Sequence, residues 1–308
     1  MSVRSEPRQH TLDVDGVGLC YFDWQPAASA ASNAPTYLFT HATGFHARCW
    51  DAVIRALPTG GRVVAVDLRG HGRSARVAPY DWASFGADLR TLVERLDLRD
   101  VVGVGHSMGG HCTVQAAAAL PERFQRLVLV DPVIMNPDYY HLASGHGLTD
   151  PLEHPISRRK GDFNSWQAMF ERFRERDPYS LWRVDVLEDY CRYGVLPAAD
   201  GGGVELACPP LIEASVYVGT TGVDIRHLLP RIEVPVAVLR AAERDASADR
   251  MDFSASPTWP DLAAQFPRGV DLHLPELTHF IPMQAPDLVA RCVAAPVAGR
   301  AELSSLLP

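Results

Sequence analysis

Short apolar runs and helical stripes alternate along the first part of the chain. Four apolar runs bounded by turn-forming residues predict buried parallel strands, at residues 37–40, 63–66, 101–104 and 127–130. Between the second and third runs, apolar residues from Phe85 to Leu96 recur at the spacing of one helix face, and Asp81 is placed to cap that helix. An alanine-rich helix is expected at about 109–120. This alternation of strand and helix predicts an α/β fold with a mostly parallel sheet.

Two further patterns complete the predicted sheet. Near the N-terminus, apolar runs between Thr11 and Trp24 flank Asp15-Gly16, a dipeptide that favours the tight turn of a β-hairpin. The alternation stops after Asp131-Pro132 and resumes with strands at 236–239 and 270–274 and a helix at 286–295. One domain made of residues 1–132 and 232–308 is therefore expected.

The interval at 133–231 is too long to be an ordinary connection and is predicted to be an inserted helical cap. One stripe runs from Trp166 through Phe170 to Phe173, and another starts at Val184 and is stopped by Gly194. We interpret the aromatic residues as packing of the insertion onto the main domain. Trp166 and Phe170 are also candidates to line a substrate pocket, and the two interpretations are compatible.

Composition narrows the classes of function. The 29 basic and 37 acidic residues give a net charge of -8, and the basic residues do not gather into a face that would bind nucleic acid. The six cysteines show neither metal-binding spacing nor a disulfide framework, so buried free thiols are expected. No signal peptide or membrane span is visible, so we expect a cytoplasmic protein without a membrane partner; the oligomeric state is open.

The candidate nucleophile is Ser107. Gly105-His106-Ser107-Met108-Gly109 fits G-x-S-x-G and lies where a predicted strand ends and a helix begins, which is the setting of a nucleophile elbow. A serine on so sharp a turn needs small flanking residues, and the helix after it directs free amides toward the reacting oxygen. We interpret His106 as a packing residue.

The candidate base is His279, because it alone among the twelve histidines follows the last predicted strand and precedes the last helix. A carboxylate must hold this base, and the chain order serine, acid, histidine favours Asp245, after the strand at 236–239. Glu243 and Asp131 are the alternatives.

Two backbone amides are expected to stabilise the oxyanion of the tetrahedral intermediate. One is the amide of Met108, directly after the nucleophile. The other belongs to the turn His41-Ala42-Thr43-Gly44-Phe45, where Thr43 is the candidate donor.

With these residues in place, the chain resembles the α/β-hydrolase superfamily from about Thr11 to Ala295, the inserted cap excepted. The resemblance also rests on Val66-Asp67-Leu68-Arg69-Gly70-His71-Gly72-Arg73-Ser74 and on His279-Phe280-Ile281-Pro282 with Ala285-Pro286-Asp287. It implies a mostly parallel eight-stranded sheet flanked by helices. The chain departs from the family by having Ala42 in place of a glycine and Ala242 in place of the glycine of Gly-x-x-Asp.

The sequence favours a serine hydrolase that cleaves an ester or lactone of a small-molecule substrate, with no metal or organic cofactor. A serine rather than an aspartate as nucleophile argues against epoxide-hydrolase or dehalogenase chemistry. A C–C bond hydrolase, a thioesterase or an amidase with the same triad is the alternative within the enzymes. A small-ligand binding or sensing protein is the alternative of another class.

Overall fold

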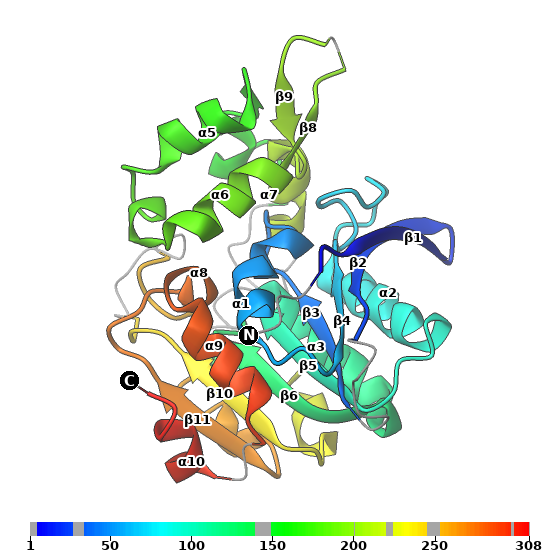
Figure 1. The fold of residues 1–308 in the computed structure, drawn as a ribbon, viewed down its shortest axis with the longest axis vertical. Helices are drawn as coiled ribbons and strands as arrows, with labels where there is room; N and C mark the ends of the chain where they lie inside the picture. Colours follow the sequence, from blue (N-terminus) through cyan, green and yellow to red (C-terminus); the bar gives the residue numbers. More distant parts are fainter. Residues whose placement is uncertain are drawn as a thin grey trace.

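The computed structural model describes residues 5–26, 34–138, 149–199, 201–219, 224–244, 253–296 and 299–307. Its main sheet has eight strands in the order β1-β2-β4-β3-β5-β6-β10-β11 (Figure 1). They are β1 (Arg8–Val14), β2 (Val17–Trp24), β3 (Thr36–Thr40), β4 (Arg62–Val66), β5 (Val101–His106), β6 (Phe124–Val130), β10 (Val236–Arg240) and β11 (Gly269–His273). Strands β4 to β11 in this order pair in parallel, and β1 and β2 add an antiparallel edge. The predicted α/β fold is confirmed.

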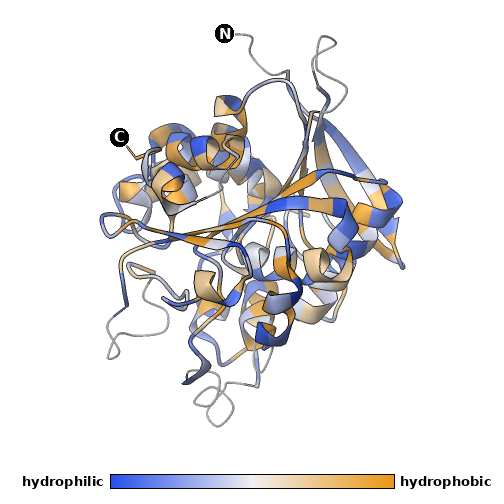
Figure 2. Cartoon of the chain, turned by 90° about the horizontal axis from the view of Figure 1, so that it is seen from below, coloured by the Kyte–Doolittle hydropathy of each residue, from blue (hydrophilic) through white to orange (hydrophobic). Residues whose placement is uncertain are grey.

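Helices cover both faces of this sheet. They are α1 (Asp51–Ala56), α2 (Trp82–Arg95), α3 (Met108–Ala119), α8 (Ile281–Gln284), α9 (Pro286–Ala294) and α10 (Arg300–Ser304). Successive side chains of a strand point to opposite faces of the sheet and pack into two cores. Leu38 of β3 packs with the core of α2 and α3, whereas Phe39 packs with the core of α1 and α9. Figure 2 shows the hydrophobic strands between helices on both sides.

The turn at Asp15-Gly16 and the helix cap at Asp81 form as predicted from the sequence. Asp15 and Gly16 both have positive φ, of 50° and 88°, and join β1 to β2 as a tight hairpin turn. The side chain of Asp81 accepts a hydrogen bond from the amide of Ser84 and caps α2. All six cysteines are free and buried, as expected.

Most of the segment between β6 and β10 folds beyond the carboxyl ends of the strands, at the top of Figure 1, whereas its last element, η5 (Arg226–Arg231), packs beside α3. The segment contains the short 3-10 helices η3 (Pro155–Arg158), η4 (Tyr179–Leu181) and η5 (Arg226–Arg231), the helices α5 (Trp166–Phe173), α6 (Val184–Tyr193) and α7 (Pro210–Val218), and the strands β7 (Asp162–Phe163), β8 (Val195–Pro197) and β9 (Val204–Leu206). The insertion contains the expected helices, and β7, β9 and β8 add a small antiparallel sheet that was not predicted. Strands of two or three residues are too short to show an alternating pattern in the sequence.

The insertion packs onto the main domain through a shared apolar cluster. Met169 and Leu187 of the insertion belong to the same buried cluster as Cys49 of η1 (Ala47–Trp50) and Phe280 of the main domain. Among the described residues, no helix is both long and apolar enough to cross a membrane.

Candidate active site

Ser107 occupies the sharp turn between β5 and α3. Its φ of 57° and ψ of -121° lie outside the regions that L-residues ordinarily adopt. The carbonyl oxygen of Ser107 accepts hydrogen bonds from the amides of Gly110 and His111, and its own amide donates to Val130. The surrounding backbone therefore holds the strained residue in place, as a nucleophile elbow requires.

The two flanking glycines are required by close backbone approach. A Cβ atom on Gly105 would lie 2.5 Å from the carbonyl oxygen of Gly109, and one on Gly109 would lie 2.3 Å from the carbonyl oxygen of Thr40. Real Cβ atoms do not come so close to backbone atoms. The G-x-S-x-G pattern thus follows from packing of the turn against β3 and α3.

His279 lies in the loop between β11 and α8, with its ring against Ser107. Its Nε2 is 2.9 Å from Oγ of Ser107, and its Nδ1 is 2.7 Å from Oδ2 of Asp131. An ionised carboxylate only accepts hydrogen bonds, so Nδ1 of His279 carries the proton and Nε2 is free to accept one from the serine hydroxyl. Both Ser107 and His279 are buried.

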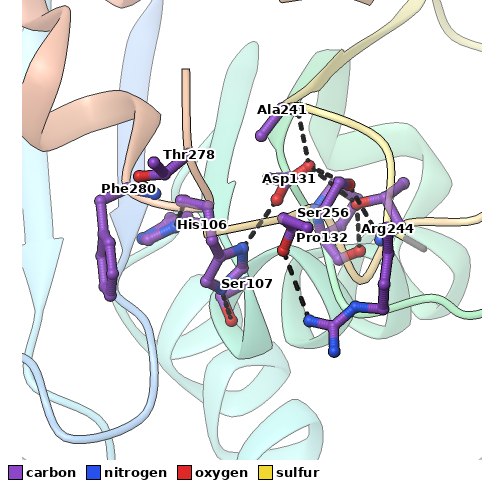
Figure 3. Close-up of polar contacts among 12 residues, drawn as sticks. His106, Ser107, Asp131, Pro132, Ala241, Arg244, Ser256, Thr278 and Phe280 are labelled. Carbon is purple, nitrogen blue, oxygen red and sulfur yellow. Dashed lines mark hydrogen bonds and ion pairs between the residues drawn. The ribbon is translucent and has the colours of Figure 1, made fainter. Parts of the chain in front are cut away.

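Asp131 follows β6 directly and is fully buried, with a φ of 44°. Its Oδ1 accepts a hydrogen bond of 3.0 Å from the amide of Ala241 and one of 2.5 Å from the hydroxyl of Ser256 (Figure 3). The hydroxyl of Thr258 lies 3.2 Å from the same oxygen and 2.7 Å from the carbonyl oxygen of Pro132. These three donors hold the buried carboxylate in position.

The carboxylate that contacts His279 among the described residues is Asp131, one of the alternatives to Asp245, which the chain order favoured. Asp245 itself lies outside the described residues. The physical reason is the topology: β6 and β10 are adjacent parallel strands, with Val130 paired to Leu239. Residues after either strand reach the same edge of the sheet, so the sequence alone does not distinguish the two positions.

Hydrogen bonds of three polar residues at this site were not predicted from the sequence. Ser256 and Thr258 contact Asp131, but they follow a segment with no recognisable motif and come after β10 by more than a dozen residues. His106 was interpreted as packing, yet its Nε2 donates a hydrogen bond of 2.8 Å to the carbonyl oxygen of His279. Burial lowers the pKa of His106 far below its usual value, so the ring is neutral.

The turn after β3 lies against the start of α3. The amide of Phe45 donates to the carbonyl of Ala42, and Gly44 has a φ of 78°, which is the left-handed conformation. The hydroxyl of Thr43 is 3.3 Å from the sulfur of Met108. Because Met108 is the first residue of α3, its amide has no acceptor within the helix.

Aromatic side chains surround the imidazole of His279. Phe253 and Phe280 are in ring contact with it, and Phe45 connects Phe280 to Trp182 of the insertion. Trp166 and Phe170, both on α5, are partly buried against the shared apolar cluster, and each has an arginine over its ring. Their packing fits the first interpretation, and a role in the substrate pocket stays a prediction.

Comparison with known proteins identifies the family of the chain. A sequence model described as the alpha/beta hydrolase family matches residues 37–292, which is most of the chain. The protein belongs to the alpha/beta hydrolase family.

The similar proteins are named for different activities. A bifunctional esterase/perhydrolase from Acinetobacter calcoaceticus is 28% identical over 74% of this chain and 79% of its own length. A non-heme chloroperoxidase from Streptomyces lividans is 38% identical over 39% of this chain, but this chain covers only 42% of it. Among solved structures, E-2-(acetamidomethylene)succinate hydrolase has a TM-score of 0.73 at 18% identity, with 93% of this chain and 97% of that chain covered. At such identity the structural likeness concerns the fold alone.

Proposed function

We propose that the protein is a serine esterase that uses Ser107, His279 and Asp131 as a catalytic triad. The observation that carries the proposal is the unbroken series of contacts from Ser107 Oγ through both nitrogens of His279 to Asp131. A serine hydroxyl is a weak nucleophile until a base takes its proton, and this arrangement supplies the base and fixes its tautomer.

The reaction would proceed in two halves. In the first, Nε2 of His279 takes the proton from Ser107 Oγ as this oxygen attacks the ester carbonyl, and the imidazolium then protonates the departing alcohol. In the second, His279 takes a proton from water, the hydroxide attacks the acyl-enzyme, and the proton returns to Ser107 Oγ as the acid leaves. Asp131 stabilises the imidazolium in both halves without taking its proton.

The amides of Met108 and Thr43 are the proposed donors to the oxyanion. The contact between the Thr43 hydroxyl and the Met108 sulfur supports this role, because it keeps the turn after β3 beside the N-terminus of α3. One such donor is worth about 3 kcal/mol of barrier in comparable enzymes.

Residues 133–231 would serve as a cap over Ser107. The support is the packing of Trp182 and Tyr190, both from the insertion, against Phe45 beside the oxyanion turn. A cap of this kind excludes water and gives the site an apolar wall that selects the substrate.

The esterase/perhydrolase among the relatives favours ester cleavage over the other reactions open to a triad. The test is to measure hydrolysis of a panel of esters, lactones, thioesters and amides by the wild-type protein and by Ser107→Ala. The proposal expects esters to be turned over fastest and the alanine variant to lose at least about 10³-fold in kcat. Faster turnover of thioesters or amides would reassign the substrate class. Tight ligand retention with no turnover would favour a binding protein.

A further inference from the structure

Ser256 lies in a short segment between β10 and β11, residues 253–259, that is bound to two loops of the site. The carbonyl oxygen of Phe253 accepts a hydrogen bond of 3.2 Å from the amide of His279, and the two rings are in contact. The amide of Ser256 itself donates to the carbonyl oxygen of Ala242, in the loop after β10, at 2.7 Å. The backbone of this segment is therefore fixed against the loops that follow β10 and β11.

Two hydroxyl groups of the segment lie at Oδ1 of Asp131, and they differ in how fully they bind it. Oγ1 of Thr258 is 2.7 Å from the carbonyl oxygen of Pro132 and 3.2 Å from Oδ1. Because a hydroxyl carries one proton, Thr258 donates mainly to the nearer acceptor. Oγ of Ser256 is 2.5 Å from Oδ1, which is the acceptor of its proton. Ser256 is therefore the stronger of the two side-chain donors to this carboxylate.

The hydroxyl of Ser256 is itself held in place. The residue is 5% exposed, and its Oγ accepts a hydrogen bond of 3.1 Å from the amide of Thr258. The oxygen thus has one fixed donor and one fixed acceptor, so its position relative to Asp131 is set by the backbone of the segment.

The two carboxylate oxygens of Asp131 have separate partners. The amide of Ala241 and the hydroxyl of Ser256 reach the same oxygen, Oδ1 (Figure 3). The other oxygen, Oδ2, is 2.7 Å from Nδ1 of His279. The bond between Cβ and Cγ of an aspartate is a soft torsion, and rotation about it would move Oδ2 away from Nδ1. Two donors from different loops at Oδ1 oppose that rotation.

We propose that Ser256 is a positioning residue of the proposed triad, whose hydroxyl holds the Asp131 carboxylate in the orientation that aligns His279 with Ser107. This inference rests on the proposed esterase function and adds to it a residue that acts through Asp131 rather than on the substrate. Without this donor the carboxylate can turn and the imidazole loses its alignment. Both halves of the reaction then slow, because both use the same ring.

The first measurement is ester hydrolysis by Ser256→Ala, with circular dichroism as the check of its fold. Its kcat should fall by about 10-fold or more, because the reacting groups are misaligned. Its KM should stay within about 3-fold of the wild type, since no substrate contact is removed.

Ser74→Ala is the matched control. Ser74 is also 5% exposed; its hydroxyl donates to the carbonyl oxygen of Asp67, and its Oγ accepts a hydrogen bond from the amide of Cys20. These partners lie in β2 and directly after β4, and in the sheet β3 and β5 separate those two strands from β6 and β10. The control should therefore keep the kcat of the wild type.

The second measurement observes the contact between Asp131 and His279 directly. The proton on Nδ1 of His279 lies in a short bond to a carboxylate, so it should give a low-field resonance in proton NMR that disappears in Asp131→Asn. This resonance should move to higher field or broaden in Ser256→Ala and stay unchanged in Ser74→Ala.

Ser256→Cys separates the hydrogen bond from the volume of the side chain. The thiol has a similar size but is a weak donor, so this variant should show the same loss of kcat and the same change of the resonance as Ser256→Ala. It also provides the test if the alanine variant does not fold.

A folded Ser256→Ala or Ser256→Cys protein with a kcat within about 3-fold of the wild type, or with an unchanged resonance, would overturn the inference. An equal loss of kcat in Ser74→Ala would do the same, because the effect would then belong to any buried serine. If no ester is hydrolysed, the proposed function fails separately and the resonance decides. A resonance that is absent from the wild type, or the same in the Ser256 variants, then overturns the positioning role.

Discussion

The imidazole of His106 donates a hydrogen bond of 2.8 Å from Nε2 to the backbone carbonyl of His279. The residue before Ser107 thereby holds the loop that carries His279, the proposed base. Trp50 and Phe45 meet the ring of His106 edge-on, so its orientation is fixed by packing. The distance between Ser107 and His279 thus depends on a side chain that takes no part in proton transfer.

Substitution of His106 should misplace the base without affecting substrate binding. We expect His106→Leu to lower kcat by about 10- to 100-fold with little change in KM, since small displacements of reacting groups have effects of this size. His106→Gln, whose amide can donate to the same carbonyl, should recover part of the loss. Equal activity of the leucine and wild-type proteins would show that the hydrogen bond is not needed.

The identity of the acid can be tested with three isosteric variants. Asp131→Asn should lower kcat/KM on one ester by about 10⁴-fold, because an amide does not hold the working tautomer of His279. Glu243→Gln and Asp245→Asn should each stay within about 3-fold of the wild type, since neither carboxylate is needed when Asp131 contacts Nδ1. If Asp245→Asn were the inactive variant, the contact between Asp131 and His279 would not be the catalytic one.

The free energy of unfolding should decrease at acidic pH because histidines are buried in the folded protein, and His46 is the clearest case. Burial lowers its pKa from 6.5 to about 3, so the unfolded chain binds a proton that the folded protein refuses. The contribution to stability is complete above pH 6.5 and is lost as the pH falls toward 3, by about 1.4 kcal/mol per pH unit. Urea unfolding between pH 5 and 7.5 should therefore show a shallower dependence for His46→Gln. If the free energy of unfolding of the wild-type protein and of His46→Gln had the same pH dependence, the assignment of this effect to His46 would be contradicted.

The preference for acyl chain length tests which aromatic residues line the substrate pocket: Phe280 beside His279, or Trp166 and Phe170 on α5. Phe280, which touches His279, should affect the ratio of kcat/KM between short and long acyl esters by about 10-fold when changed to alanine. Trp166→Ala and Phe170→Ala test the same property on α5. If they alter the ratio as much as Phe280→Ala does, α5 lines the pocket; if they leave it unchanged in folded proteins, their role is packing.

Site features that depend on local contacts could be predicted from the sequence, whereas those that depend on contacts between distant segments could not. The elbow at Ser107 was predictable, because Gly105 and Gly109 are required by contacts within a few residues and with the adjacent strand. His279 was predictable from its place after the last strand. The carboxylate that contacts His279 was not, since Asp131 and the loop after β10 are brought together by the pairing of strands far apart in the sequence.

The residues that contact Asp131 could not be predicted from the sequence for the same reason. Ser256 contacts Asp131 across 125 positions, and no pattern in the chain relates the two. The pairing of Arg159 with Glu213 likewise depends on how the insertion folds back on itself. The small sheet of the insertion was missed because its strands are too short to show a period.

The most direct test of the central claim is covalent labelling by an organophosphonate, which reacts with an activated serine and not with an ordinary one. Intact-mass measurement should find one adduct on the wild-type chain, peptide mapping should place it on Ser107, and Asp131→Asn should react far more slowly. No labelling of the folded wild-type protein, or labelling that persists in Ser107→Ala, would contradict the assignment of Ser107 as the nucleophile.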